Sequence, residues 1–501
     1  MARGDGTVSE HRKNVLLVTV DEWPARLMGA AGHPVIETPT LDALARAGTR
    51  FTNAYSETPV CVPARRSLMT GTDPRTHGDR IAQGTLRMPD LPTLAGTFRD
   101  AGYQAAAIGK LHVYPQRDRI GFDDVILAEE GRQLNGCVDD YEAFLAERGH
   151  PGQHFLHGMG NNEYGWRPWH MAEDMHPTNW IAMQAARTIK RRDPTRPGFW
   201  YVSFTAPHPP LVPLASYFER YARRDIDEPA TADWSAAMDD LPPALQSVRH
   251  YWPALPHEQL ADMRRAYYAL CTHIDHQLRI IIGTLREEGI LDDTVILFTS
   301  DHGDMLGDHG LYAKRLMYEA SANIPMILMG AASDGDRVAP GAVDDRLCGL
   351  QDVMVTLLDL CGIDVPSTCT GLSMAGAERR DTFYGECSEG LEATRMVHDG
   401  RFKLIWYPVG NRFQLFDLEA DPQETRNLAA SPDHRDRLAA LRQVLCDNLY
   451  GSDLAYVADG EIVGMPTVEV RARPNRGLSG QRGLQYPPLP YRDPKLATRT
   501  L

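Results

Sequence analysis

Short apolar segments rich in β-forming residues alternate with helical segments along most of this chain of 501 residues. Residues 14–20, 103–108, 199–205 and 294–299 are such apolar runs, and each is predicted to form a buried strand. Strands that alternate with helices pair mainly in parallel, and a parallel sheet is covered by helices on both faces. The sequence therefore predicts an α/β fold in which a large, mostly parallel sheet is sandwiched between helices.

Charged or ionisable residues follow these strands closely. Asp21 follows the first run, Lys110 the second and His208 the third, while Asp301 and His302 follow the fourth. In open α/β sheets, ligands bind beyond the carboxyl ends of the strands. A random scatter of charged residues would not repeat this placement four times, so we predict the functional site at this edge of the sheet.

The helices are predicted from apolar spacing and from end signals. In residues 38–48, Thr38 would be the N-cap, Pro39 the first helical residue and Gly48 the end. The further helical segments are residues 91–101, 178–191 and 434–449, and residues 260–288 form one long helix or two.

The sequence changes in character after about residue 380. Residues 401–407 and 413–418 are predicted to be short antiparallel strands, and a polar helix follows them. We predict a catalytic domain over residues 1–380 and a small C-terminal subdomain, an antiparallel sheet plus a helix, over 381–457. Residues 458–501 are rich in Pro, Arg and Gly and would be an extended or disordered arm, through which a homo-oligomer could form.

The composition limits the partners of the chain. Lys and Arg number 52 and Asp and Glu 67, which gives a net charge of −15. This excess of negative charge argues against nonspecific binding to nucleic acid and against docking on anionic membranes. An anionic substrate would therefore need positive charge that is concentrated in a pocket or on a metal.

No targeting or anchoring segment is evident in the sequence. No apolar run reaches the roughly 18 residues of a membrane span. The first apolar run is too short for the core of a signal peptide and lacks a small-residue cleavage site. The eight cysteines are scattered without a C-x-x-C pair, as is typical of buried reduced thiols. We therefore expect a cytoplasmic protein.

Cys61 begins the motif Cys61-Val62-Pro63-Ala64-Arg65, which is followed by Leu68-Met69-Thr70-Gly71. The motif alone leaves two interpretations open. Cys61 is either a free cysteine at the start of a helix, or the target of a maturing enzyme that oxidises cysteine to formylglycine, an aldehyde.

The rest of the chain decides between them, because it resembles the type I, formylglycine-dependent sulfatases of the alkaline-phosphatase superfamily, close to the arylsulfatase and phosphonate monoester hydrolase branch. The matching segments, besides the Cys61 motif, are residues 18–21, 109–112, 206–209, 299–304, Lys314 and 415–428. They run from residue 14 to about residue 430, and together they are far more specific than any one of them alone.

The resemblance implies one divalent cation held by Asp21, Asp301, His302 and the modified Cys61. Oxygen-rich ligation suggests Ca²⁺, and the imidazole leaves Mn²⁺ or Mg²⁺ open. It is the resemblance, and not the number of ligands, that places Ca²⁺ first. The family often has a second acid after the first, and here that position is Glu22, a longer side chain whose reach stays open. Taken alone, Asp21 would more often be a loop or capping carboxylate.

The resemblance also implies roles for the basic residues. Arg65 would brace the modified residue, and Lys110 and Lys314 would neutralise the sulfate oxygens. His112 would accept a proton from the second hydroxyl of the aldehyde hydrate and so release sulfate, while His208 with Lys314 would assist the leaving alcohol. The alternatives are a surface ion pair for Arg65, solvated lysines, a core histidine at 112 and a rigid turn at 208.

Residues 150–180 show little periodicity and contain Trp166, Trp169 and Trp180. They would form either a wall of the substrate pocket, with aromatic faces for an aryl group or sugar, or a packed surface loop. His309, which stands in a near repeat of the segment around His302, is expected to be structural.

Three functions follow from this sequence. The first is a sulfatase that hydrolyses a small-molecule sulfate ester after a formylglycine-generating maturase has acted on Cys61. The second is a phosphonate monoester or phosphodiester hydrolase with the same modified cysteine. The third is a catalytically inactive binding relative, which the filled catalytic positions argue against.

Overall fold

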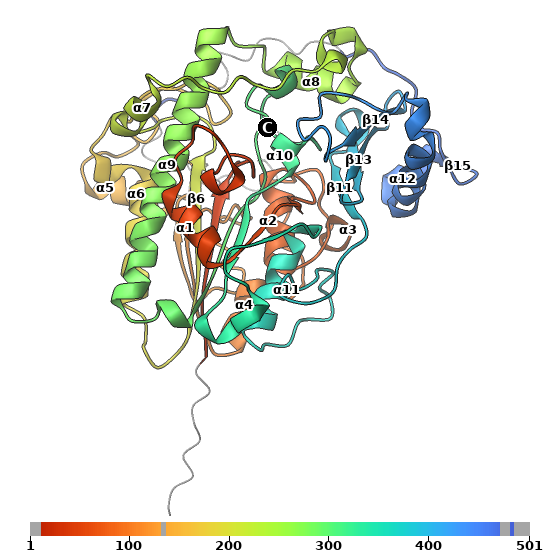
Figure 1. Cartoon of the computed structure of the whole chain (residues 1–501). Helices are drawn as coiled ribbons and strands as arrows, with labels where there is room; N and C mark the ends of the chain where they lie inside the picture. The colour runs from red at the N-terminus through yellow and green to blue at the C-terminus, as the bar shows by residue number, and fades with distance from the viewer. Residues whose placement is uncertain (1–11, 132–136, 471–480, 485–501) are drawn as a thin grey trace, which may run out of the picture.

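The computed structural model describes residues 12–131, 137–470 and 481–484. Its centre is an eight-stranded sheet with the order β5-β4-β6-β1-β7-β8-β2-β9 (Figure 1). The strands are β1 (Asn14–Asp21), β2 (Thr49–Phe51), β4 (Gln104–Gly109), β5 (Asp124–Leu127), β6 (Gly198–Pro207), β7 (Thr294–Ser300), β8 (Met326–Met329) and β9 (Ala342–Asp344). Strands β5, β4, β6, β1 and β7 pair in parallel, whereas β8 pairs antiparallel to both β7 and β2. The prediction of a large, mostly parallel sheet is confirmed.

Helices cover both faces of this sheet because successive residues of a strand point to opposite sides. From β1, Leu16 and Val18 pack in one core with α1 (Pro39–Ala47), α6 (Pro177–Lys190) and α9 (His257–Glu287). Val15 and Leu17 pack in a second core with α2 (Cys61–Thr70), α4 (Leu94–Asp100) and α11 (Gln351–Leu360). A strand buried on both faces is apolar throughout, which explains the continuous apolar runs in the sequence.

The predicted helices form, with changes at their ends. Residues 260–288, for which one or two helices were open, form the single helix α9. The segment 91–101 begins its helix at Leu94, after Thr93, whose hydroxyl accepts a hydrogen bond from the Gly96 N–H at 3.1 Å. Thr38 precedes α1 as predicted, but its hydroxyl accepts a hydrogen bond from the Gly29 N–H instead of capping its own helix.

The C-terminal part is a separate antiparallel sheet of β11 (Phe383–Cys387), β12 (Thr394–His398), β13 (Phe402–Tyr407) and β14 (Arg412–Asp417). Helix α12 (Arg435–Asn448) packs on it through Leu441 and Leu445 (Figure 1). In the segment predicted to be an arm, β15 (Val457–Ala458) and β16 (Glu461–Ile462) form a short hairpin. Residues 471–480 and 485–501 lie outside the described part, and the domain boundaries stay a prediction.

The remaining elements are short. They are β3 (Ala54–Tyr55), β10 (Cys348–Gly349), α3 (Pro74–His77), α5 (Asp140–Glu147), α7 (Ala215–Tyr221), α8 (Pro243–Tyr251) and α10 (Glu319–Ala322). Helix α8 lies against the turn Gly390–Glu392, which joins β11 to β12 in the C-terminal sheet.

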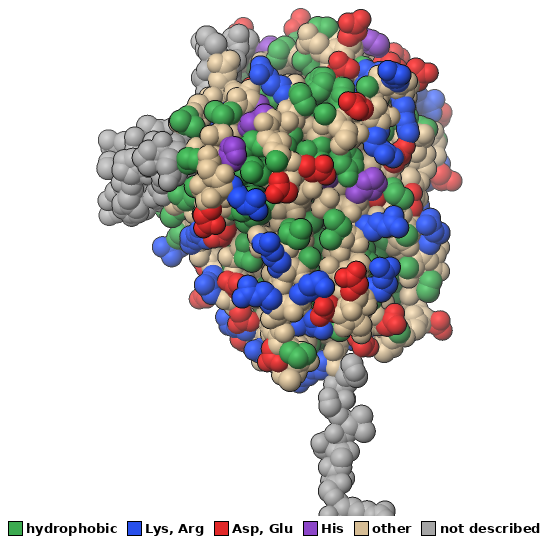
Figure 2. All heavy atoms as spheres, turned by 90° about the vertical axis from the view of Figure 1, so that its left-hand side faces the viewer, with side chains coloured by type: hydrophobic (Ala, Val, Ile, Leu, Met, Phe, Trp, Pro, Cys, Tyr) green, Lys and Arg blue, Asp and Glu red, His purple; other side chains and the backbone are tan. Residues whose placement is uncertain are grey.

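The surface carries charges of both signs. On the face shown in Figure 2, Lys and Arg are interspersed with Asp and Glu, without a broad basic patch. No helix among the described residues has the length and hydrophobicity to cross a bilayer.

Candidate active site

The pairing of the central strands brings the predicted site residues together at one edge of the sheet. In the register of β1, Val20 lies opposite Ser300 of β7, and Asp21 lies opposite Pro207 of β6. Asp301 and His208 are the next residues along β7 and β6, so they flank Asp21. The site therefore lies beyond the carboxyl ends of adjacent parallel strands, where such folds bind ligands.

Cys61 also lies at this edge of the sheet, as the first residue of helix α2. Because the helix begins at Cys61 itself, Pro63 lies in its first turn. Pro63 is tolerated because N–H groups in the first turn have no partner within the helix. The Cys61 Sγ atom lies 3.2 Å from His302 Nε2 and 3.7 Å from Asp21 Oδ1. The free N–H groups of the first turn add positive potential at residue 61.

Asp21, Cys61, Asp301 and His302 fit a divalent cation. One donor atom of each lies within 4.8 Å of the others, and all four residues are buried. The His302 Nδ1–H donates to the Gly303 carbonyl at 3.0 Å, which leaves the Nε2 lone pair facing the cluster. Carboxylate oxygens with one imidazole suit Ca²⁺, Mn²⁺ or Mg²⁺.

Glu22 belongs to a neighbouring group with Asp21 and His208, whose donor atoms also lie within 4.8 Å of one another. Its Oε2 accepts a hydrogen bond from Lys314 at 2.9 Å, while its buried Oε1 has no hydrogen-bond partner among the described residues. Burial raises the pKa of Glu22 well above its ordinary value, against the effect of Lys314. A buried carboxylate oxygen that has no hydrogen-bond partner here suits a further contact, either with the cation or with the substrate.

Arg65 holds several elements of the site in place. Its Nε donates to Asp301 Oδ2 at 2.9 Å, and its Nη1 donates to the Lys110 carbonyl, Tyr201 and Ser203 at 2.9–3.0 Å. Burial opposes its charge, but Asp301 is the main group that raises the pKa of Arg65 well above its ordinary value. Arg65 thus orients Asp301 and the end of β4, while its predicted role of bracing the modified residue 61 stays a prediction.

Two lysines flank the cluster, each with an N–H to spare. Lys110 contacts Asp21 and donates to Glu130 at 2.7 Å, and Lys314 donates to Glu22 at 2.9 Å and to His208 Nε2 at 2.8 Å. Both ammonium groups are buried, and their carboxylate neighbours keep them charged by raising the pKa against the opposing effect of burial. An ammonium has three N–H groups, so each lysine can still donate one to an anion.

His208 is held as a neutral imidazole. Its Nδ1–H donates to the Pro209 carbonyl at 2.6 Å, so Nε2 is the atom that accepts from Lys314. Burial, and after it the charge of Lys314, lowers the pKa of His208 well below its ordinary value. Within this pair, the proton that faces the site is therefore carried by Lys314.

His112 lies two residues beyond Lys110 and is half-buried. Its φ of 56° is in the left-handed region, and its N–H donates to the Glu129 carboxylate at 3.0 Å. A side chain in this sparsely populated conformation is often held so for function. The catalytic role of His112 stays a prediction.

Three further residues of the site, Glu130, Tyr201 and Ser203, were not predicted from the sequence. Glu130 binds Lys110, and its carboxylate lies 3.9 Å from His208 Nδ1. It follows β5, a strand of four residues whose apolar part was too short to be recognised, although an acidic pair after Asp124–Leu127 repeats the pattern of the other strands. Tyr201 and Ser203 belong to the apolar run of β6, where alternate side chains point to the site.

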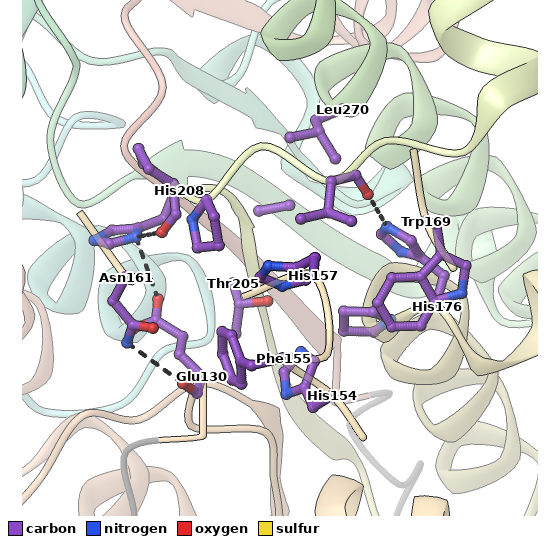
Figure 3. Close-up of a pocket in the computed structure, with 15 residues that line it drawn as sticks. Glu130, His154, Phe155, His157, Asn161, Trp169, His176, Thr205, His208 and Leu270 are labelled. Atoms are coloured by element: carbon purple, nitrogen blue, oxygen red, sulfur yellow. Dashed lines mark hydrogen bonds and ion pairs between the residues drawn. The ribbon is translucent and has the colours of Figure 1, made fainter. Parts of the chain in front are cut away.

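The segment 150–180 divides between the two roles that were open for it. His154, Phe155, His157 and Trp169 line a cavity of about 60 Å³ beside His208 and Glu130 (Figure 3). Trp166 instead stacks on Phe218, with ring centroids 3.9 Å apart, and Trp180 is buried in the core on α6. His309 packs against Trp234 and Tyr318, as a structural residue would.

Residues 481–484 contact this same wall. The Arg482 N–H donates to the Gly158 carbonyl at 3.1 Å, and its guanidinium donates to the Gly131 carbonyl at 3.1 Å and contacts Asn161. The guanidinium also lies over the ring of Phe155, 4.2 Å from the centroid. A segment near the C-terminus thus braces the loop that carries Glu130.

The fold and this site define a hydrolase of the alkaline-phosphatase superfamily. The sequence matches the sulfatase family over residues 13–363, and residues 307–449 match the C-terminal region of N-sulphoglucosamine sulphohydrolase. The chain belongs to the sulfatase family and is a sulfuric ester hydrolase.

Relatives agree in fold and differ in substrate. An arylsulfatase of Clostridium perfringens is 34% identical over 90% of this chain and 97% of its own length. A choline-sulfatase of Rhizobium meliloti is 30% identical over 84% of this chain and 83% of its own length. The phosphonate monoester hydrolase of Silicibacter pomeroyi superposes with a TM-score of 0.74 at 26% identity, over 87% of this chain and 94% of its own.

Proposed function

We propose that this enzyme hydrolyses a sulfate monoester with residue 61 in its formylglycine form and one divalent cation beside it. The observation that carries this proposal is the convergence on Cys61 Sγ of His302 Nε2 and Asp21 Oδ1, at 3.2 and 3.7 Å. The formylglycine hydrate would supply an oxygen nucleophile at this point, and the cation would polarise the sulfate and lower the pKa of that hydroxyl.

An unmodified Cys61 suits nucleophilic attack poorly. Burial and the charge of Asp21 raise the pKa of the Cys61 thiol to about 11. The reactive form of cysteine is the thiolate, which such a thiol does not provide near neutral pH. This supports conversion of Cys61 by a maturase over direct use of its sulfur.

The residues of the chain divide the remaining work. Asp21, Asp301 and His302 hold the cation, and Arg65 fixes Asp301 and the end of β4 relative to residue 61. Lys110 and Lys314 each direct a spare N–H to the sulfate, where negative charge spreads in the transition state. Lys314 donates the proton to the leaving alcohol oxygen, and His208, through Nε2, orients that ammonium. His112 accepts a proton after sulfate transfer.

Mass spectrometry tests the modification. Because Cys61 is buried at the start of α2, we expect the maturase to act before folding, so the two proteins are produced together. The peptide that contains residue 61 should lose roughly 18 Da, while that with the buried Cys271 keeps its thiol as the internal control. Full activity with an alkylatable thiol at position 61 would refute the proposal.

Kinetics separates the two histidines. His112→Ala should release a stoichiometric burst of alcohol and then stall, because its base acts only after the first bond breaks. His208→Ala should slow the first step, most strongly for poor leaving groups, which depend most on proton donation. A burst with His208→Ala and none with His112→Ala would reverse the assignments. A loss below about tenfold for both would make them structural.

A phosphonate monoester or phosphodiester substrate is the second candidate, and the likeness to phosphonate monoester hydrolases favours it. The two activities differ in the charge of the transition state. Values of kcat/KM for 4-nitrophenyl sulfate, a 4-nitrophenyl phosphodiester and phenylphosphonate monoester decide between them. A clear preference for either phosphorus ester would overturn sulfate as the main substrate.

A further inference from the structure

A second cavity is lined by Lys314, the residue that hydrogen-bonds His208 Nε2, and it is distinct from the cavity shown in Figure 3. It measures about 300 Å³, against about 60 Å³ for the cavity beside His208. Small-molecule sites start at about 300 Å³, whereas the smaller cavity has room for only a few waters. Lys314 lines the larger cavity, so an alcohol that receives a proton from Lys314 has space there and not in the smaller one.

Aromatic side chains form one wall of this larger cavity. Tyr251 ends α8 and is 40% exposed, and Trp252 follows it with a ring centroid 4.3 Å away in an edge-to-face arrangement. The Trp252 Nε1–H donates to the Asn162 carbonyl at 2.9 Å, which fixes the indole. An exposed tyrosine and an oriented indole offer flat apolar faces to a ring of the substrate.

Arg315 also lines this cavity, next to Lys314 in the sequence, and its backbone is held by hydrogen bonds. Its φ is 74°, its N–H donates to the Pro59 carbonyl at 2.8 Å, and its carbonyl accepts from the Thr394 hydroxyl at 3.4 Å. Its half-buried guanidinium has no ion pair or hydrogen bond with any described residue. Half-buried Arg346 and Arg380 differ, since they pair with Asp344 and Asp352.

The charges around this cavity leave the guanidinium available. The positive charge of Lys314 is already paired with the carboxylate of Glu22. Glu392 is the acidic residue among those that line the cavity. A half-buried cation without a counter-ion is unfavourable unless a ligand supplies one, and the planar guanidinium matches carboxylate or sulfate oxygens well.

We propose that Arg315 determines specificity by binding an anionic group, a carboxylate or a second sulfate, on the leaving alcohol, whose ring packs on Tyr251 and Trp252. This inference rests on the proposed function of the site. The substrate class is then a sulfate ester of an aromatic or sugar alcohol that carries a second negative charge.

Matched substrates test this proposal. They are 3-carbamoylphenyl sulfate, which is neutral outside the ester, 3-carboxyphenyl sulfate and benzene-1,3-disulfate, and kcat/KM is measured with each. The wild-type enzyme should prefer the charged substrates by roughly tenfold or more, as expected for a charge-assisted contact. Arg315→Gln should lose that preference through a higher KM for the two charged substrates, and it should keep the wild-type rate on 3-carbamoylphenyl sulfate. The ratio of kcat/KM for 3-carboxyphenyl sulfate to that for benzene-1,3-disulfate shows whether a carboxylate or a second sulfate is the preferred anion.

Two further variants complete the comparison. Arg315→Lys keeps the charge without the planar fork and should restore part of the preference. Arg279→Gln removes an exposed arginine on α9, outside the cavity lining, and should leave the ratio unchanged. An equal loss on all substrates, or an unchanged ratio in Arg315→Gln, would overturn the role of Arg315.

Binding of the product alcohols separates this inference from the proposed function. Calorimetry with 3-hydroxybenzoate and 3-hydroxybenzamide needs no turnover. Tighter binding of the benzoate that is lost in Arg315→Gln would support the anion site even if sulfate esters were not cleaved. Equal affinities for both alcohols in the wild-type enzyme would overturn it even in an active sulfatase.

Discussion

Two groups of buried ions in this protein are satisfied to different degrees. In the scaffold cluster (Arg80, Glu386, Arg395 and Asp453), Arg395 makes two bonds of 2.8 Å to Asp453, and its Nη1 donates to three carbonyls. Arg80 Nη1 donates to Glu386 and Asp453, both at 2.8 Å. At the catalytic centre, by contrast, Glu22 Oε1 has no hydrogen-bond partner among the described residues, and each lysine keeps an unused N–H.

The difference separates a cluster that holds the fold from one that awaits a ligand. A buried polar network that is satisfied internally fixes one arrangement of its elements. A buried network with atoms left over is costly unless a substrate or cation completes it. We therefore expect changes in the scaffold cluster to alter stability, and changes at the catalytic centre to alter turnover.

The largest effect on turnover should come from Cys61→Ala. Residue 61 is the proposed nucleophile, and removing a nucleophile from a group of residues that act together costs roughly 10³-fold or more in kcat/KM. The unfolding free energy should stay near that of the wild type, because the Cys61 thiol lies at the catalytic centre and is not part of the scaffold cluster. Activity assays with urea unfolding of the same preparation check both points, and a large loss of stability would contradict the division of roles.

The largest effect on stability should come from Arg395→Met. The side chain is fully buried, and its loss leaves Asp453 and several carbonyls short of partners, which costs roughly 3–5 kcal/mol. Turnover per folded molecule should remain close to that of the wild type. Arg401→Met, which breaks a partly exposed pair with Asp417, is the matched control and should cost less than about 1 kcal/mol. Equal losses in the two variants would contradict the scaffold role.

Glu57 tests whether every unsatisfied buried oxygen marks a ligand site. Its Oε1 accepts from the Gln351 N–H at 3.0 Å, while its buried Oε2 has no hydrogen-bond partner among the described residues. Burial raises the pKa of Glu57 from 4.5 to about 8, so the folded protein holds this carboxyl protonated at neutral pH. It is therefore a neutral group of the scaffold. Glu22 differs from it in that its other oxygen accepts a hydrogen bond from a lysine of the site, Lys314, at 2.9 Å.

This raised pKa gives a pH dependence of definite sign. The folded state binds the proton more tightly than the unfolded state, so the stabilisation is complete below pH 4.5 and is lost as the pH rises through about 8. The slope is at most about 1.4 kcal/mol per pH unit. Glu57→Gln imitates the protonated carboxyl and should flatten the unfolding free energy over this window, whereas Glu419→Gln at an exposed position should not. An unchanged slope would show that Glu57 is not the titrating group.

The sequence predicted the part of the site that lies at the strand ends. Asp21, Lys110, His208 and Asp301 were found because buried strands are apolar throughout and stop at a charge. Glu130 was missed because its strand, β5, is short and only partly buried. The cavity at Arg315 could not be predicted, because its walls come from α8, the segment after β7 and the β11–β12 turn, and no local pattern brings these together.

The contact of Arg482 with the wall of the site could not be predicted from the sequence either, because no local pattern brings these segments together. The variant that tests this contact, Arg482→Ala, should have the smallest effect. Arg482 donates to the Gly131 carbonyl and lies over Phe155, and Gly131 follows Glu130 in the chain. Glu130 in turn binds Lys110 at 2.7 Å. Loosening this loop should lower kcat/KM by roughly two- to tenfold, the range of a contact worth about 1 kcal/mol. Arg426→Ala, at an exposed position, is the control, and unfolding measurements exclude a loss of fold. If kcat/KM of Arg482→Ala equals that of the control, the arm merely rests on the surface, and the catalytic centre is complete without it.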